Sequence, residues 1–130
     1  MKLLGLDYGD AKIGLAIGDT DSKVASPFKI LKNAGWNNLF QDLKLICQKE
    51  KIEKIIIGMP INKKSPDQAK RVSDFIAELK EQLNIEVEFQ DEQFTTAQAS
   101  KLINNGKKQD DDIAAMLILQ AYLDANFIIL

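Results

Sequence analysis

Three groups of acidic residues stand where a folded chain could bring them together. Asp7 ends an almost wholly apolar run near the N-terminus, Asp91 and Glu92 end a later alternating run, and three aspartates at 110–112 precede the last apolar stretch. Separated carboxylates that converge suit hard divalent cations, because Mg²⁺ and Mn²⁺ prefer oxygen ligands. Two such ions about 3.5–4 Å apart can hold both the attacking and the leaving oxygen of a phosphodiester. The acids therefore predict metal-dependent phosphodiester hydrolysis.

Histidine is absent from the chain, and Cys47 is the single cysteine. A structural zinc site, which takes histidine and cysteine ligands, is therefore excluded. Any acid–base or metal chemistry must come from carboxylates. Cys47 lies at the end of a stretch with helical apolar spacing, so we expect it to be buried rather than reactive. It has no partner for an internal disulfide, which fits a reducing compartment, and we expect a cytoplasmic protein.

The length of 130 residues, with 45% apolar and 28% charged residues, predicts a single globular domain over 1–130. Asp7 interrupts the first apolar run before a signal peptide could form, and no stretch reaches the ~18 apolar residues of a membrane span. We therefore expect no membrane association. The net charge of −2 does not indicate a nucleic-acid binder. Only basic pairs at 63–64, 70–71 and 107–108 favour one locally, and ordinary solvated surface is the alternative explanation for them.

Apolar patterns predict three strands at the start of the chain. Residues 2–8 form a short apolar run, and residues 13–17 alternate apolar side chains with small ones. Residues 24–31 form a third strand, in which Pro27 marks a bulge or a sheet edge. We expect these strands to form an antiparallel meander.

The apolar spacing then changes, and it predicts helices over 39–47 and 69–83, each followed by a strand, over 54–58 and 85–89. Two further helices are predicted over 96–103 and 111–125. Asn37 and Asn38 are candidate caps for the first of these helices. A meander followed by β-α-β units implies an α/β fold: a five-stranded mixed sheet with two parallel strands added to the antiparallel three-strand meander, and helices on both faces. The carboxyl ends of the parallel strands would then bring Asp7, Gly58 and the 91–92 pair to one edge, where ligands bind.

Several residues near these acids allow both a structural and a functional interpretation. One aspartate of 110–112 would suffice to cap the last helix, whereas three repel one another unless a cation or solvent relieves them. Gly9 either lets a phosphate approach the backbone or simply forms a turn. Lys12 either contacts a phosphate or is an exposed strand residue. Thr95 either contacts a phosphate or caps a helix together with Gln98.

Four motifs in order resemble those of the YqgF/RuvX family, small proteins of the ribonuclease H-like, Holliday-junction-resolvase-like superfamily. They are Leu-Asp-Tyr-Gly at 6–9 with Lys-Ile-Gly-Leu-Ala at 12–16, Ile-Gly-Met-Pro at 57–60, Asp-Glu-Gln-Phe-Thr-Thr at 91–96, and Asp-Asp-Ile-Ala-Ala at 111–115. Each motif alone is weak, but the four cover nearly the whole chain in the right order.

The resemblance implies a ribonuclease H-like fold and a nuclease that matures the 5′ end of precursor 16S ribosomal RNA during ribosome biogenesis. It implies Asp7, Glu92 and Asp111 as the catalytic acids, which would bind Mg²⁺ or Mn²⁺. Asp111 is chosen because it stands three residues before Ala114, and Asp91 is the alternative to Glu92. From loop placement we expect nucleic-acid contacts from Gly9, Lys12, Lys63, Lys64, Thr95, Lys107 and Lys108.

Departures from the family pattern weaken the expected grip on substrate. Ala11-Lys12 stands where the family usually has Lys-Arg, and Gln93 stands where it usually has arginine. Glutamine does not replace the bidentate grip of arginine on a phosphate. The loop after Pro60 is shortened and lacks the usual Asp-Gly.

These departures and the low net charge keep a catalytically inactive nucleic-acid-binding module as one alternative. A Holliday junction resolvase acting on DNA is another, and it would need two symmetry-related sites, hence a homodimer rather than a monomer. A sugar kinase or actin-type ATPase also carries an Asp-x-Gly loop. Such proteins hold the nucleotide between two domains, whereas this sequence predicts one domain and has no second motif of that kind.

Overall fold

The computed structural model describes residues 1–59, 66–91 and 111–127. Its strands form one sheet in the order β3-β2-β1-β4-β5. The antiparallel part consists of β1 (Lys2–Tyr8), β2 (Lys12–Asp19) and β3 (Val24–Lys32). The parallel part adds β4 (Ile52–Met59) beside β1 and β5 (Glu86–Asp91) beside β4. The predicted five-stranded mixed sheet, a meander plus two parallel strands, is thus confirmed.

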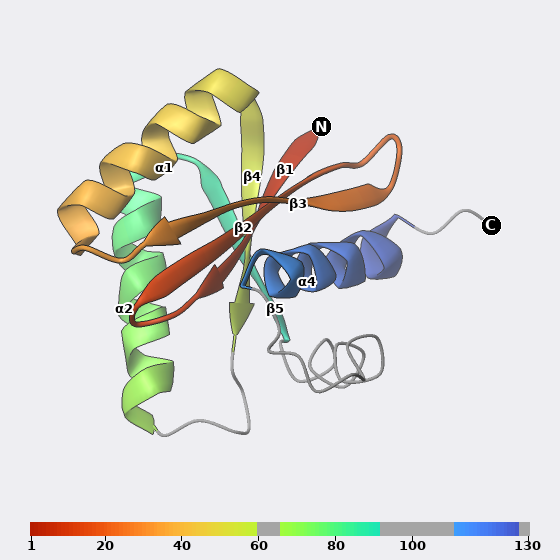
Figure 1. Ribbon diagram of the computed structural model, residues 1–130. Coiled ribbons are helices and arrows are strands. Elements are labelled where there is room, and N and C mark those ends of the chain that lie inside the picture. Colours follow the sequence, from red (N-terminus) through yellow and green to blue (C-terminus); the bar gives the residue numbers. More distant parts are fainter. Residues whose placement is uncertain (60–65, 92–110, 128–130) are drawn as a thin grey trace.

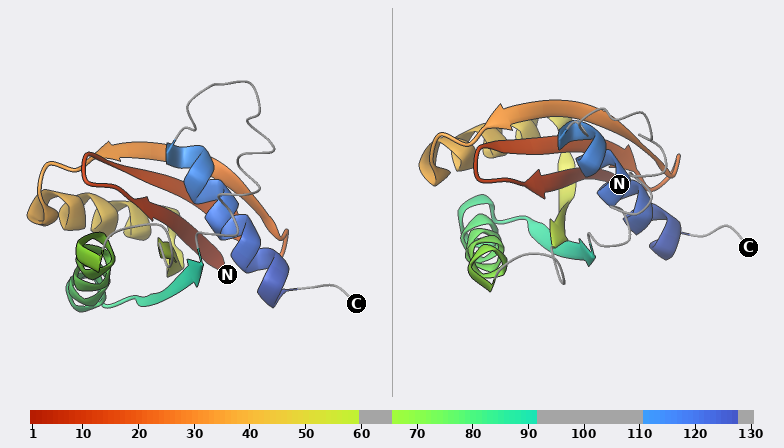
Figure 2. Two further views of the ribbon diagram at one scale, coloured as in Figure 1. Left: turned by 90° about the horizontal axis from the view of Figure 1, so that it is seen from below. Right: turned by 60° about the horizontal axis from the view of Figure 1, so that its bottom comes forward.

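Helices cover both faces of this sheet, as predicted. Helices α1 (Trp36–Glu50) and α2 (Pro66–Leu83) pack on one face, and α4 (Asp111–Asn126) crosses the strands on the other (Figures 1 and 2). The helix predicted over 96–103 lies outside the described residues. None of the helices in the described part is long and apolar enough to cross a membrane.

Side-chain alternation divides the interior into two cores. Leu4 and Leu6 of β1 point into the core beneath α1 and α2, which is centred on the fully buried Phe75. Leu3 points the other way, into the core beneath α4, where it joins Ile118. Because the middle of β1 and of β4 is buried on both faces, residues 3–6 and 55–57 are continuous apolar runs instead of alternating ones. The end of β1 is therefore fixed from both sides.

The second core depends on a glycine that lets α4 approach the sheet closely. A Cβ atom at Gly5 would lie 2.8 Å from Leu119 Cβ and 2.9 Å from the Ala115 carbonyl oxygen. Both contacts are at or beside the helix backbone, so they could be relieved only by moving the helix. Gly5 thus sets the distance between β1 and α4.

The edge strand β3 carries the irregularity predicted at Pro27. Its pairing with β2 shifts register, since Ala16 lies opposite Pro27 but Leu15 lies opposite Lys29. The extra residue, Phe28, forms a bulge at the sheet edge. Proline tolerates this place because it has no N–H group to donate to a neighbouring strand.

The start of α1 differs from the prediction. The helix begins at Trp36, with Gly35 as N-cap and no side-chain capping bond, so Asn37 and Asn38 lie inside its first turn. The indole Nε1 of Trp36 donates to the Tyr8 hydroxyl over 3.1 Å. This tertiary contact brings Trp36 into the helix and overrides the local preference of asparagine for a capping position.

Adding a methyl group at Gly5 should force the helix and the sheet apart. We expect Gly5→Ala to lower the free energy of unfolding by about 1–3 kcal/mol, the usual cost of overpacking a core. Urea unfolding followed by circular dichroism measures this change. An unfolding midpoint equal to that of the wild type would contradict the close contact described.

Cys47 is half-buried beside the core of α1 and α2, and burial raises the pKa of its thiol to about 11. Because the thiolate is the reactive form, native protein should react with iodoacetamide at pH 8 roughly two-hundredfold more slowly than a free cysteine with a pKa of about 8.5. The rate should rise about tenfold per pH unit up to about pH 10. Mass spectrometry of timed samples measures it, with urea-unfolded protein as the control. Equal rates in both states would contradict the shift.

Candidate active site at the carboxyl edge of the sheet

Asp7 stands in a row of residues without bulky neighbours within the sheet. In β2 its register partner is Gly14. In β4, Leu6 is level with Ile57, so Gly58 is the next residue alongside Asp7, and Gly58 is in turn level with Gln90 of β5. The strand neighbours on both sides of Asp7 are therefore glycines. Because these glycines have no side chains, the Asp7 carboxylate is the only functional group among the three adjacent strand positions 7, 14 and 58.

Alternation along β1 places Asp7 on the face that α4 covers. Leu3 belongs to the core beneath α4, and Gly5 lies directly under that helix, so Asp7, two residues further on, shares their face. Asp7 is half-buried there, and it takes part in an interaction within the protein.

The contacts of α4 show which end of the helix lies nearest Asp7. A Cβ atom at Gly18, which is level with Leu3, would meet Leu119 and Leu123, whereas one at Gly5 would meet Ala115 and Leu119. A step of two residues along β1, from Leu3 to Gly5, thus corresponds to one turn of α4 toward its N-terminus. The next two residues of β1 lead from Gly5 to Asp7, and the corresponding turn of α4 leads from Ala115 to Asp111, the first residue of the helix. The first turn of α4 therefore approaches the Asp7 end of β1.

The end of β5 lies two strands away from β1 at the same edge. Its even-numbered residues share the face of Asp7, because Glu88 accepts a hydrogen bond from Lys54, which also donates to Tyr122 of α4. The hydrogen bond with Tyr122, followed by that from Lys54, lowers the pKa of Glu88. The backbone of Asp91 ends β5 opposite Met59. Glu92 lies outside the described residues.

The predicted triad is therefore only partly described. Among the described residues, no group of three acidic, cysteine or histidine side chains could hold a metal ion. Asp7 is placed, Asp111 is placed through its backbone alone, and Glu92 is not described. The donors available at this edge are carboxylates in a chain without histidine, a set that fits a hard divalent cation and not zinc.

A hydrogen-bond brace that the sequence did not reveal holds the turn after Asp7. The Asn33 amide Nδ2 donates to the Gly9 carbonyl oxygen over 3.0 Å and lies 3.5 Å from the Tyr8 hydroxyl, which also accepts the Trp36 bond. The backbone N–H of Asn33 donates to the Ala11 carbonyl over 2.9 Å. Asn33, the residue directly after β3, therefore fixes the chain just after Asp7. The only sequence signal was a lone tryptophan just beyond a strand.

Aromatic rings pack against Tyr8 and Trp36, two members of this brace. The Tyr8 ring packs on Phe75 with a centroid distance of 4.7 Å, and Phe75 also packs against Trp36 and Phe40 at 5.6 and 5.4 Å. These rings come from β1, α1 and α2. They join all three elements beneath the residue next to Asp7.

The predicted substrate contacts fall into two groups. A Cβ atom at Gly9 would lie 2.5 Å from the Lys12 carbonyl oxygen, so the tight turn by itself requires glycine, and the phosphate contact stays a prediction. Lys12 is exposed at the start of β2, on the face of Asp7, and pairs in register with the exposed Lys32 of β3. Lys32 was not among the predicted contacts. The other predicted residues lie outside the described part: Lys63, Lys64, Thr95, Lys107 and Lys108.

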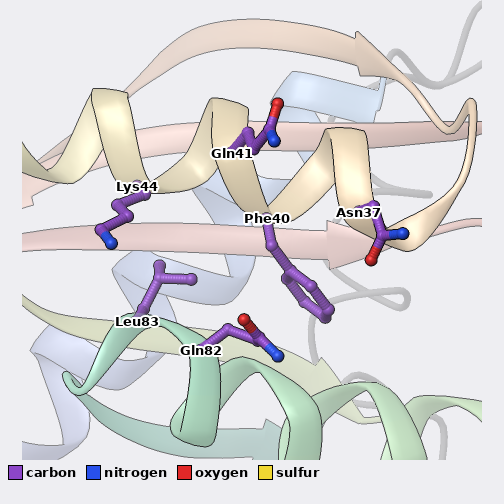
Figure 3. A pocket seen from close by; sticks show the side chains of 6 residues that line it. All are labelled: Asn37, Phe40, Gln41, Lys44, Gln82 and Leu83. Atoms are coloured by element: carbon purple, nitrogen blue, oxygen red, sulfur yellow. The ribbon is translucent and has the colours of Figure 1, made fainter.

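A separate pocket of about 290 Å³ lies away from Asp7. It is lined by α1 and the last turn of α2, where Gln82 and Leu83 face Phe40 and Lys44 (Figure 3). That end of α2 leads into the amino end of β5, whereas Asp7 stands at the carboxyl end of the parallel β1. The pocket therefore carries no part of the chemistry expected of the acids.

Comparisons with known proteins agree with the geometry. A family model described as "RuvX: Holliday junction resolvase" matches residues 1–125. A protein of Clostridium tetani named "Putative pre-16S rRNA nuclease" is 37% identical over 98% of this chain and 99% of its own length. A protein of the same name from Caldanaerobacter subterraneus subsp. tengcongensis is 36% identical over 97% and 98%.

Among solved structures, RuvC of T. thermophilus in complex with a Holliday junction substrate superposes with a TM-score of 0.65. It covers 96% of this chain and 94% of its own, at 12% identity. At that identity the likeness concerns the fold alone, and it confirms the predicted ribonuclease H-like fold.

The brace on the turn after Asp7 should be measurable. Asn33→Ala leaves the Gly9 carbonyl without its side-chain donor, and we expect it to lower the free energy of unfolding by about 1 kcal/mol. The matched control is Asn37→Ala, an exposed asparagine in the first turn of α1, which should change stability by no more than about 0.5 kcal/mol. Urea unfolding of both variants decides. Equal effects at the two positions would mean that Asn33 does not brace the turn.

Proposed function

The chain belongs to the RuvX family, and on this premise we propose that it is a divalent-metal-dependent nuclease that processes the 5′ end of precursor 16S ribosomal RNA. The observation that carries the proposal is the approach of the first turn of α4 to Asp7, on one face and at the carboxyl edge of the sheet. The near full-length similarity to proteins named for pre-16S rRNA favours RNA as the substrate.

In this proposal three acids would hold the metal. Asp7 is the last residue but one of β1, Asp111 begins α4, and Glu92 follows Asp91, the last residue of β5. The family resemblance favours Glu92, and Asp91 remains the alternative. Bound Mg²⁺ or Mn²⁺ would stabilise charge on the attacking and leaving oxygens of the phosphodiester. Which of the two metals acts there is part of what an assay must decide.

The protein's own residues would orient the substrate. The exposed Lys12 and Lys32 stand side by side on the face of Asp7, so they offer two positive charges to backbone phosphates next to the acids. The N-terminus of α4 adds N–H groups and the positive end of a helix dipole, which favour an anion. The brace of Asn33 and Trp36 holds the end of β1 so that Asp7 keeps its place during binding. Such a substrate implies action in the cytoplasm, by one nuclease domain.

Holliday junction cleavage is the second candidate, because the matching family model carries that description. Junction DNA has two-fold symmetry, so this activity would need a dimer with two copies of the Asp7 edge. Competition between precursor rRNA and junction DNA for the same protein separates the two candidates. The preferred substrate is the one that inhibits cleavage of the other at lower concentration.

Removal of the Asp7 carboxylate tests the catalytic part of the proposal. We expect Asp7→Asn to reduce Mn²⁺- or Mg²⁺-dependent cleavage of a precursor rRNA by about 10²–10³-fold, because one metal ligand is lost. Asp42→Asn makes the same change of charge on the exposed surface of α1 and should leave cleavage unchanged. If wild type and Asp7→Asn show the same trace cleavage, the protein is a binding module and not an enzyme.

A further inference from the structure

We propose that Arg71 binds a non-scissile backbone phosphate of the nucleic-acid substrate, and that Asp10 holds its guanidinium ready at the edge of the sheet. This inference rests on the proposed nuclease function and adds a substrate contact on the side of the sheet opposite Lys12. Arg71 is the only arginine of the chain.

An ion pair joins Arg71 to the turn after Asp7. Its Nη1 atom lies 2.9 Å from Asp10 Oδ1. Asp10 follows Asp7 by three residues, a span of at most roughly 10 Å even for an extended chain. The guanidinium is therefore within two or three nucleotides of the scissile phosphate, which would lie at Asp7. That is too far for a part in the cleavage step and suitable for a neighbouring phosphate.

The core fixes α2 at this distance. Phe75 stands one helical turn after Arg71, is fully buried, and packs against the ring of Tyr8, the residue that follows Asp7. The same aromatic contacts reach α1 through Trp36. Arg71 is thus carried by a part of α2 that is packed against the end of β1, and its meeting with Asp10 follows from that packing.

The ion pair of Arg71 and Asp10 contributes little to the stability of the fold, so the Arg71 guanidinium can exchange its partner for a phosphate without a large loss of stability. The side chains of Arg71 and Asp10 are 54% and 55% exposed. Ion pairs at such exposure stabilise a fold only weakly, since water screens both charges. A guanidinium has five N–H donors in a planar fork, and a phosphate can take two of them in parallel. A phosphate can therefore replace or join the Asp10 contact at small cost.

The arrangement of charge indicates a strand of nucleic acid crossing the rim of the sheet. Lys12 and Lys32 lie on the face of Asp7, and Arg71, paired with Asp10, lies on the face that α2 covers, so cationic side chains stand on both sides of the carboxyl edge. In a chain with a net charge of −2, this placement is local.

Binding measurements at several salt concentrations test the role of Arg71. Fluorescence anisotropy would follow the binding of a labelled precursor-rRNA fragment to the Asp7→Asn protein, in which we expect cleavage to be about 10²–10³-fold slower. We expect Arg71→Gln to bind about 5–10-fold more weakly, and the slope of log affinity against log salt to fall by about 0.7–0.9, the value for one phosphate contact. Arg71→Lys should keep the slope and lose only about twofold in affinity, because it keeps the charge but not the fork.

Two further variants give this experiment its controls. Asp10→Asn should bind about 2–5-fold more tightly, since it removes a carboxylate that competes with phosphate. Lys80→Gln removes one positive charge in the last turn of α2 and should change affinity less than about twofold with an unchanged salt slope. Unfolding temperatures should match in all variants, because the exposed pair stabilises the fold only weakly.

The possible failures separate the two proposals. If Arg71→Gln and Lys80→Gln have the same affinity and the same salt slope, Arg71 does not contact a phosphate and this inference is wrong, while cleavage that depends on Asp7 still supports the nuclease. If neither RNA nor junction DNA binds, and the wild type cleaves neither, the proposed function and this inference fail together.

Discussion

The close approach of α4 to β1 is the constraint on which the candidate site depends. Gly5 has no Cβ, and the space that a Cβ would need is occupied by Leu119 and by the Ala115 carbonyl. The helix can therefore lie against the strand, with its first turn toward Asp7. A larger residue at Gly5 would move the helix as a whole, and with it the acid that begins it. The geometry of the site is thus decided by packing two residues away from the first carboxylate.

The end of β1 is held as firmly from the other face. Tyr8 points away from Asp7 and is fixed by its contact with Phe75 and by the Trp36 hydrogen bond. Helices α1 and α2 thus position the turn that carries Asp10, and Asp111 is the first residue of α4 on the other face. A strand end that is anchored on both faces can keep a carboxylate in place when a highly charged substrate binds, which catalysis by preorganised charge requires.

Local patterns predicted the fold, and contacts distant in sequence account for what they missed. The change from alternating to helical spacing, the continuous apolar run at 54–58 and the position of Pro27 were sufficient for the sheet and for its bulged edge. The candidate caps Asn37 and Asn38 were wrong, because a bond from Trp36 to Tyr8 starts the helix earlier. The sequence predicts a role for Asp7 because this acid ends a buried apolar run, and that role stays a prediction.

The pairing of Lys12 with Lys32 and of Arg71 with Asp10 could not be predicted from residue spacing, since strand register and helix packing create both.

A crystal soaked in Mn²⁺ and measured for anomalous scattering tests most directly the central claim that Asp7 belongs to a metal site. We expect an anomalous peak between the carboxylates of Asp7 and Asp111, with Glu92 as a further ligand, and no such peak in Asp7→Asn crystals. A manganese ion bound elsewhere in the wild type, with none at Asp7, would contradict the account.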